Sequence, residues 1–332
     1  MVVFNGSKRL PGVSKLSQTA VLGFSLSKTD TIKDMAEGVG GGPEAPGQRR
    51  FDVLMGLNKS LVFRVSEVLG AEDLGEIPAH LPLIIATSHF SDADVQTVES
   101  VLRPQLKKVR PGHGLGITLQ SDNFRDLRTA LPIKLVGKEH FFPLDAYPDE
   151  ETGHLRFRFN PENFDKMTEA LQKGTDLIIS AHEPLSNITG LSWELPGKSG
   201  LGAAYLAQRT NATLLPVAVD IQTDQPVAMS ADVGGTIKRL IKGQRPKVRV
   251  IIGQPFNLDQ TYREAWESFE KRYAACYGKA ASRTQVETLT AEEKNEERVR
   301  YGQVKEHIRK QSDLVMKKIA DLLPKRKRGV WR

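Results

Sequence analysis

The most informative stretch of this chain runs Leu83-Ile84-Ile85-Ala86-Thr87-Ser88-His89-Phe90-Ser91-Asp92-Ala93-Asp94. Its apolar first half predicts a short buried strand, and the polar residues after it are typical caps of a following helix. His89 then lies at a strand-to-helix turn, and Asp94 follows about one helical turn later. Ligands of open α/β sheets bind at the carboxyl ends of strands. This position makes His89 a candidate general base and Asp94 the carboxylate that orients it, with an ordinary surface pair as the alternative.

Short apolar runs alternate with helical patterns along the middle of the chain. The alternation predicts an α/β fold with a mixed, mostly parallel sheet flanked by helices. Residues 141–144 are expected to form a loop between these elements. The residues expected in strands are 83–86, 109–120, 133–136, 176–181, 213–221 and 248–252, and those expected in helices are 51–69, 95–102, 161–173 and 200–209.

The chain divides into three expected parts. Residues 1–47 form a leader with a short helix, which ends in a cluster of Gly and Pro. Residues 48–278 form the α/β domain. Residues 279–332 form a polar linker, a long charged helix over Glu292–Leu323 and a basic end, Lys325–Arg328. The sequence leaves several interpretations of this end open: a nuclear signal, non-specific phosphate contact, membrane contact, or a disordered, solubilising tail.

Composition narrows the class of protein. The 332 residues are 39% hydrophobic and 26% charged, which is ordinary for a soluble globular protein. With one Cys, Cys276, an intrachain disulfide is excluded, which fits a reducing, cytoplasmic or plastid-like compartment. No apolar window is long enough for a transmembrane helix, so any membrane contact is expected to be peripheral. The net charge of +7 favours an anionic substrate, an acidic carrier protein or an anionic lipid.

Three further residues are candidates for substrate binding. Glu183 follows the second buried strand, 176–181, and in a parallel sheet it would share an edge with His89. Lys138 follows a predicted strand and is expected to reach the same edge. Lys198 precedes a helix rich in small residues, and the N–H groups at such a helix start favour phosphate. Each of the three is also compatible with an ordinary solvated side chain.

The sequence predicts no metal site, no cofactor and no nucleic-acid partner. The seven His are scattered, and neither an H-E-x-x-H nor a C-x-x-C motif occurs. Lys198 does not belong to a P-loop, because Ser192 stands where that motif requires Gly. The basic end of the chain lacks the interleaved aromatic residues of a nucleic-acid surface.

The order of these motifs resembles that of the glycerophospholipid acyltransferase superfamily, which includes lysophosphatidate and glycerol-3-phosphate acyltransferases. The resemblance extends over roughly residues 83 to 256. Ser88–Asp94 is similar to the H-x4-D block of that family. The later blocks are similar to Gly137–Pro143, Ile178–Glu183, Lys198–Ala204, Leu215–Val219 and Val248–Pro255, in that order.

The resemblance implies an O-acyltransferase of the H-x4-D type. The acyl donor would be a thioester, either an acyl-CoA or an acyl carrier protein, and the acceptor a phospholipid precursor with a hydroxyl group. His89 and Asp94 would be catalytic, with Lys138, Glu183, Lys198 and Ser88 binding substrate.

Two departures from the family pattern bear on the acceptor. Ser88 stands where the family usually has Asn, and Pro184-Leu185-Ser186 replaces the Gly-Thr-Arg that follows the third block. The Arg is associated with the acceptor's phosphate, so Lys138 or Lys198 would have to replace it, or the acceptor is not a lysophosphatidate. Two other interpretations stay open: a catalytically degenerate domain that binds a lipid or protein, and a hydrolase in which His89 activates water.

Overall fold

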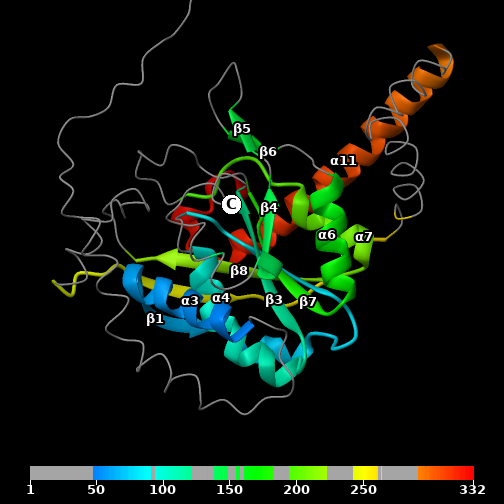
Figure 1. Cartoon of the computed structure of the whole chain (residues 1–332). Coiled ribbons are helices and arrows are strands. Elements are labelled where there is room, and N and C mark those ends of the chain that lie inside the picture. Colours follow the sequence, from blue (N-terminus) through cyan, green and yellow to red (C-terminus); the bar gives the residue numbers. More distant parts are fainter. Residues whose placement is uncertain are drawn as a thin grey trace, which may run out of the picture.

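Seven strands form the sheet at the centre of the molecule, shown in Figure 1 as a computed structural model. They pair in the order β1-β9-β8-β2-β7-β3-β4, and all neighbours are parallel except β8 and β9. The strands are β1 (Arg64–Leu69), β2 (Leu83–Thr87), β3 (Gly114–Gln120), β4 (Phe141–Leu144), β7 (Thr175–Ser180), β8 (Thr213–Ile221) and β9 (Lys247–Ile252). A separate antiparallel pair joins β5 (Ala146–Pro148) to β6 (Leu155–Phe157).

Five α-helices accompany the strands in the part of the chain that the structure describes. They are α3 (Gln48–Val62), α4 (Asp94–Val109), α6 (Pro161–Gln172), α7 (Gly202–Thr210) and α11 (Ala291–Leu322). In Figure 1, α3 lies beside α4, α6 lies beside α7, and the first half of α11 projects away from the sheet. The described residues are 48–90, 94–120, 133, 138–144, 146–148, 155–157, 161–182, 194–222, 242–260, 263 and 291–332.

The predicted fold class is confirmed: the sheet is mixed and mostly parallel, helices flank it, and a long helix lies at the C-terminal end. The predicted helical leader lies outside the described residues, as do residues 91–93 and 183–193. The core consists of the apolar strand residues together with one face of each helix. Strand β2 and strand β8 are buried along their whole length, as expected for strands with neighbours on both sides.

The predicted helix over residues 51–69 is wrong at its second half. Helix α3 ends at Val62, and residues 64–69 form the edge strand β1 beside β9. Val65 and Val68 occur at helical spacing, but β-branched side chains also suit a strand. Pairing with β9, far along the chain, decides between the two, and local periodicity does not record that pairing.

Residues 141–144, expected as a loop, form strand β4 instead. Pro143 argued against a strand because it has no N–H to donate. Strand β4 lies at the edge of the sheet, where one side of its backbone has no neighbour in the strand order, so a proline is tolerated there. The strand predicted at residues 133–136 is wrong at Ile133, which is helical and buried, and its other residues lie outside the described part.

The basic end of the chain is ordered, so the interpretation of this end as a disordered tail is wrong. After α11, the turns η4 (Lys325–Lys327) and η5 (Gly329–Trp331) fold back onto the sheet. The Lys327 ammonium is buried and donates to Asp220 Oδ1 at 2.5 Å and to the Ile221 carbonyl at 2.5 Å. Trp331 Nε1 donates to the Pro196 carbonyl at 2.8 Å. A buried carboxylate requires a counter-charge, and the tail supplies it.

Asp220 is the residue that holds the tail. Burial opposes its ionisation, but hydrogen bonds and charges from Lys327 and Arg249 outweigh burial and lower the pKa of its carboxyl group. Arg249 of β9 donates to Asp220 Oδ2 at 2.5 Å. The carboxylate is therefore ionised at neutral pH and links β8, β9 and the tail.

We predict that Lys327→Met lowers the free energy of unfolding by about 2–3 kcal/mol, because a buried charged hydrogen bond to Asp220 is lost. Urea unfolding measures the change, and limited trypsin digestion should then cleave the tail faster. Lys325→Met, at an exposed position two residues earlier, serves as the control and should leave both measurements nearly unchanged. Equal stability of the two variants would contradict the assigned role of Lys327.

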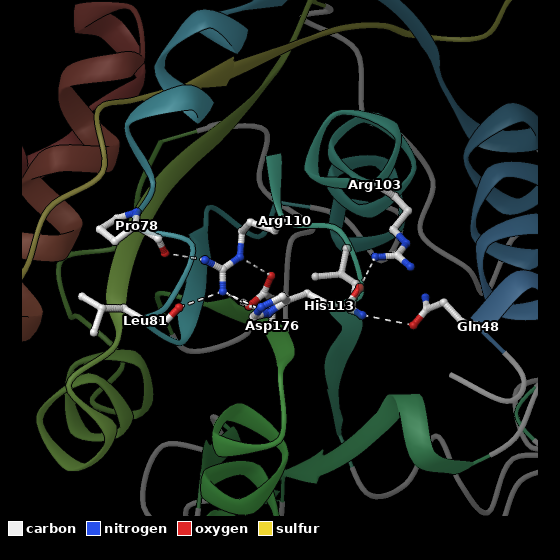
Figure 2. A network of polar contacts seen from close by, with 8 residues as sticks. Gln48, Pro78, Leu81, Arg103, Arg110, His113 and Asp176 are labelled. Atoms are coloured by element: carbon white, nitrogen blue, oxygen red, sulfur yellow. Dashed lines mark hydrogen bonds and ion pairs between the residues drawn. The ribbon is translucent and has the colours of Figure 1, made fainter. Parts of the chain in front are cut away.

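A second buried ion pair joins the amino ends of three strands (Figure 2). Arg110, directly after α4, is fully buried and donates to both oxygens of Asp176 at 2.9 Å. The same guanidinium donates to the carbonyls of Pro78 at 2.6 Å and Leu81 at 2.7 Å, in the loop before β2. His113, just before β3, places Nδ1 at 3.1 Å from Arg110 Nη2. One side chain thus connects the chain segments that enter β2, β3 and β7.

We predict that Arg110→Met lowers the free energy of unfolding by about 3–5 kcal/mol, because Asp176 would be left buried without its cation. Urea unfolding monitored by circular dichroism measures the loss. Arg209→Met removes an ion pair to the exposed Asp165 and should cost about 0–1 kcal/mol. A small effect of Arg110→Met would show that the loop carbonyls and Asp176 find other partners.

Candidate active site

The carboxyl ends of two neighbouring parallel strands, β2 and β7, meet beside the middle of β8 at the turn that contains His89. Thr87, the last residue of β2, is in register with Ser180 at the end of β7 and with Val217 in β8. The adjacency of β2 and β7 puts the two strand-end histidines, His89 and His182, at the same edge of the sheet. This is the edge at which open α/β sheets bind ligands.

Ser88 attaches this turn to β8. Its backbone N–H donates to the Val217 carbonyl at 3.2 Å, and its side-chain oxygen accepts from the Val219 N–H at 3.0 Å. The side chain is fully buried. The structure therefore places Ser88, a predicted substrate-binding residue, inside the sheet edge as a bridge between β2 and β8. Asp220, which holds the C-terminal tail, is the next residue after Val219.

His89 is half-buried, and its backbone is held by a second histidine. The His89 N–H donates to Nε2 of His182 at 2.7 Å. The two imidazole rings are 6.4 Å apart, centroid to centroid, and the ring of Phe90 lies 6.2 Å from that of His182. The half-buried imidazole of His89 combines a defined backbone position with partial exposure, which a general base needs.

Asp94 begins helix α4 and is fully buried. Its Oδ2 accepts the N–H of Phe90 at 2.5 Å. The carboxylate therefore holds the peptide that follows His89, while His182 holds the peptide that precedes it. Asp94 is thus in direct contact with the residue that follows His89.

Of the other predicted substrate-binding residues, Lys198 is described by the structure and Glu183 is not. Lys198 is exposed in a segment that the Gly200 N–H attaches to the Ala181 carbonyl at 2.8 Å, beside the end of β7. Ser199, next to it, donates to Asp313 of α11 at 2.6 Å. Glu183 lies outside the described residues, as does the segment Pro184–Ser186.

Lys138 was expected to follow a strand and to reach the His89 edge, which stays a prediction because residues 134–137 lie outside the described part of the chain. It begins the short turn η3 (Lys138–His140), which precedes β4. Phe141 is level with Ile117 of β3, and through β7 with Ile85 of β2. Lys138 comes before that level and His89 beyond it, so the two backbones lie toward opposite ends of the strands.

His182 is the residue whose part in the site was underestimated. The sequence placed it at a strand end beside Glu183, but the predicted role went to the carboxylate. The available signal was that His182, like His89, comes directly after a buried apolar strand. Among the described residues, no group of three or more potential metal ligands comes together, and no helix is long and apolar enough to span a membrane.

A buried acid on α4, Glu99, is a titratable group outside this turn. Burial raises the pKa of Glu99 well above its ordinary value, and the negative charge of Asp52 on α3 adds to the effect, whereas Arg103 and Lys107 oppose it. The Asp52 carboxylate in turn accepts from Lys107 at 3.0 Å and lies 3.3 Å from Arg103 Nε. Glu99 is an element of the α3–α4 contact and is separate from the strand-end site.

We predict that Glu99→Gln becomes more stable relative to the native protein as pH rises above about 4.3, the ordinary pKa of a glutamate in an unfolded chain. Because burial raises the folded pKa of Glu99, the folded protein holds this proton at pH values at which the unfolded chain has released it. Native stability therefore falls as pH rises above about 4.3 toward the folded pKa. Urea unfolding at several pH values measures the difference.

Glu169→Gln on the exposed face of α6 should show the opposite sign. A hydrogen bond and the charge of Lys173 lower the pKa of Glu169, so its contribution is present at high pH and lost as pH falls. If the free energies of unfolding of Glu99→Gln and of the native protein change with pH in the same way, the raised pKa of Glu99 is contradicted.

Comparisons with known proteins give one type of match. No protein-family model matches the chain, and no curated protein matches it in sequence. Among solved structures, the chain is similar to the crystal structure of the 1-acyl-sn-glycerophosphate (LPA) acyltransferase PlsC from Thermotoga maritima. The superposition has a TM-score of 0.38 at 12% sequence identity and covers 83% of this chain and 97% of that chain.

Proposed function

We propose that this chain is an acyltransferase that moves a fatty acyl group from a thioester donor to a hydroxyl of a glycerolipid-type acceptor. The donor would be an acyl-CoA or an acyl carrier protein. The observation that carries the proposal is the His89 turn: a half-buried imidazole at the carboxyl end of a central parallel strand, with both flanking peptides held. The order of the sequence blocks from Ser88 to Pro255 supports the same reaction class.

In the proposed reaction, His89 removes the proton from the acceptor hydroxyl. Asp94 orients the imidazole and stabilises the imidazolium that forms. The alkoxide attacks the thioester carbonyl, and backbone N–H groups at the sheet edge stabilise the oxyanion. Collapse of the tetrahedral intermediate forms the ester and breaks the C–S bond, and the imidazolium returns its proton to the departing thiolate. No covalent acyl-enzyme is required.

The acceptor's anionic group is assigned to Lys198 in this proposal. Lys198 is exposed on the segment that packs beside the end of β7, the strand that precedes His182. Its flexible ammonium suits a phosphate as a point charge. Glu183, one residue after His182, stays a prediction for substrate contact. Lys138 is the weaker candidate, since its backbone lies toward the amino ends of the strands.

Peripheral association with an anionic membrane is part of the proposal. The support is the net charge of +7 together with exposed basic residues around the ordered C-terminal end. Lys325, Arg326 and Arg332 are exposed there, and the side chain of Val330 is 73% exposed. A basic, partly apolar end of this kind suits an interface with anionic lipid.

We predict that His89→Gln lowers the rate of acyl transfer by about 100- to 10,000-fold while the protein stays folded. The assay incubates purified protein with radiolabelled acyl-CoA and either glycerol-3-phosphate or lysophosphatidate. Asp94→Asn should also lose most of the rate, because it cannot stabilise an imidazolium as a carboxylate does. His80→Gln, at an exposed position before β2, is the control and should retain native activity.

Three outcomes separate the alternatives. Full activity in His89→Gln excludes His89 as the base. Thioester hydrolysis that needs no acceptor and depends on His89 identifies a hydrolase. Binding of acyl-CoA or lipid without turnover in the native protein identifies a degenerate domain, which the altered Pro184–Ser186 segment would then explain.

A further inference from the structure

His182 contacts the backbone of the proposed base. It is the second residue after the end of β7 and is almost completely buried, with 1% of its surface exposed. Its Nε2 lies 2.7 Å from the backbone nitrogen of His89, and its own carbonyl accepts from Ser180 Oγ at 2.9 Å. The preceding residue, Ala181, donates its N–H to the Thr87 carbonyl at 2.9 Å. These bonds connect the end of β7 to the end of β2 through consecutive residues.

This contact defines the protonation of His182. A backbone N–H is a donor only, so the nitrogen that faces it must be an acceptor with no proton. His182 is therefore neutral, with its proton on Nδ1, when it bonds to His89. Since Nε2 is occupied by the His89 N–H, that nitrogen does not accept a proton from a substrate.

We propose that His182 is a positioning residue that holds the His89 backbone in the orientation needed for proton abstraction. The inference rests on the proposed function of His89 as the base. His182 acts on the peptide before His89, and Asp94 acts on the peptide after it. With both peptide planes held by side chains from different elements, the direction of the His89 Cα–Cβ bond is determined. A displacement of about 1 Å at a reacting group reduces a rate about 100-fold.

The tertiary contact explains why a histidine suits this position. A rigid ring places its far nitrogen well beyond its own backbone, so His182 reaches the next strand without an extra water. A buried, neutral imidazole supplies an acceptor without the cost of burying a charge. Glutamine has an acceptor oxygen at the end of a side chain of similar reach, whereas leucine fills comparable volume and has no acceptor.

The test compares His182→Gln with His182→Leu in steady-state acyl transfer from acyl-CoA to lysophosphatidate. We expect His182→Leu to lower kcat about 10- to 100-fold with KM within about twofold, because substrate binding does not involve this contact. We expect His182→Gln to retain kcat within about fivefold of the native value, since an acceptor is restored. Thermal unfolding of both variants gives the folded fraction by which the rates are corrected.

A second readout does not depend on catalysis. In 15N-labelled protein, long-range 1H–15N correlation should show His182 Nε2 as an unprotonated nitrogen. The His89 amide should exchange slowly with solvent in the native protein and in His182→Gln, and rapidly in His182→Leu. If His182→Leu does not fold, the native protein and His182→Gln still decide the assignment.

Each result has a distinct consequence. A protonated Nε2, native kcat in His182→Leu, or equal losses in the two variants would overturn the positioning role, the last because the ring itself would then take part in chemistry. Native protein that transfers no acyl group would overturn the proposed function instead. The nitrogen shift and the His89 amide exchange then determine separately whether His182 holds the turn.

Discussion

The buried pair of Arg110 and Asp176 is the interaction on which the arrangement of the central strands depends. Burying either charge alone would cost free energy. In the folded protein the two charges neutralise each other, and the carbonyls of the loop before β2 accept the remaining hydrogen bonds of Arg110. The pair holds the amino ends of β2, β3 and β7 in a common register. Strands aligned at one end are also aligned at the other, so this contact determines where His89 and His182 come to lie.

The opposite ends of the same strands carry the candidate active site. There, the contacts are hydrogen bonds from backbone N–H groups to side chains: Val219 to Ser88, His89 to His182, and Phe90 to Asp94. Only the His89 ring in this group is half-exposed. The amino ends of the central strands are therefore joined by an ion pair. Their carboxyl ends carry an imidazole whose backbone is held by hydrogen bonds. The C-terminal tail is attached through Lys327 to Asp220 of β8, the strand next to this turn.

Much of the fold was predictable because a buried strand appears in the sequence as a continuous run of apolar residues. Strands β2, β7, β8 and β9 and helices α6 and α11 lie close to their predicted positions. Two of the errors occurred where a distant partner decides the structure. Strand β1 and strand β4 are at the two edges of the sheet, and each forms through pairing with a strand that the local pattern does not reveal.

The sequence by itself determined the fold class, the succession of strand-end motifs and the candidates His89 and Asp94, because apolar periodicity and turn residues are local properties of a chain. Only the tertiary structure decided which residues hold that site together. Ser88 bonds to β8, His182 accepts the His89 N–H from the end of another strand, and the basic tail neutralises Asp220. These contacts join residues far apart in the chain, and their energies depend on burial, which arises only when the sheet is assembled.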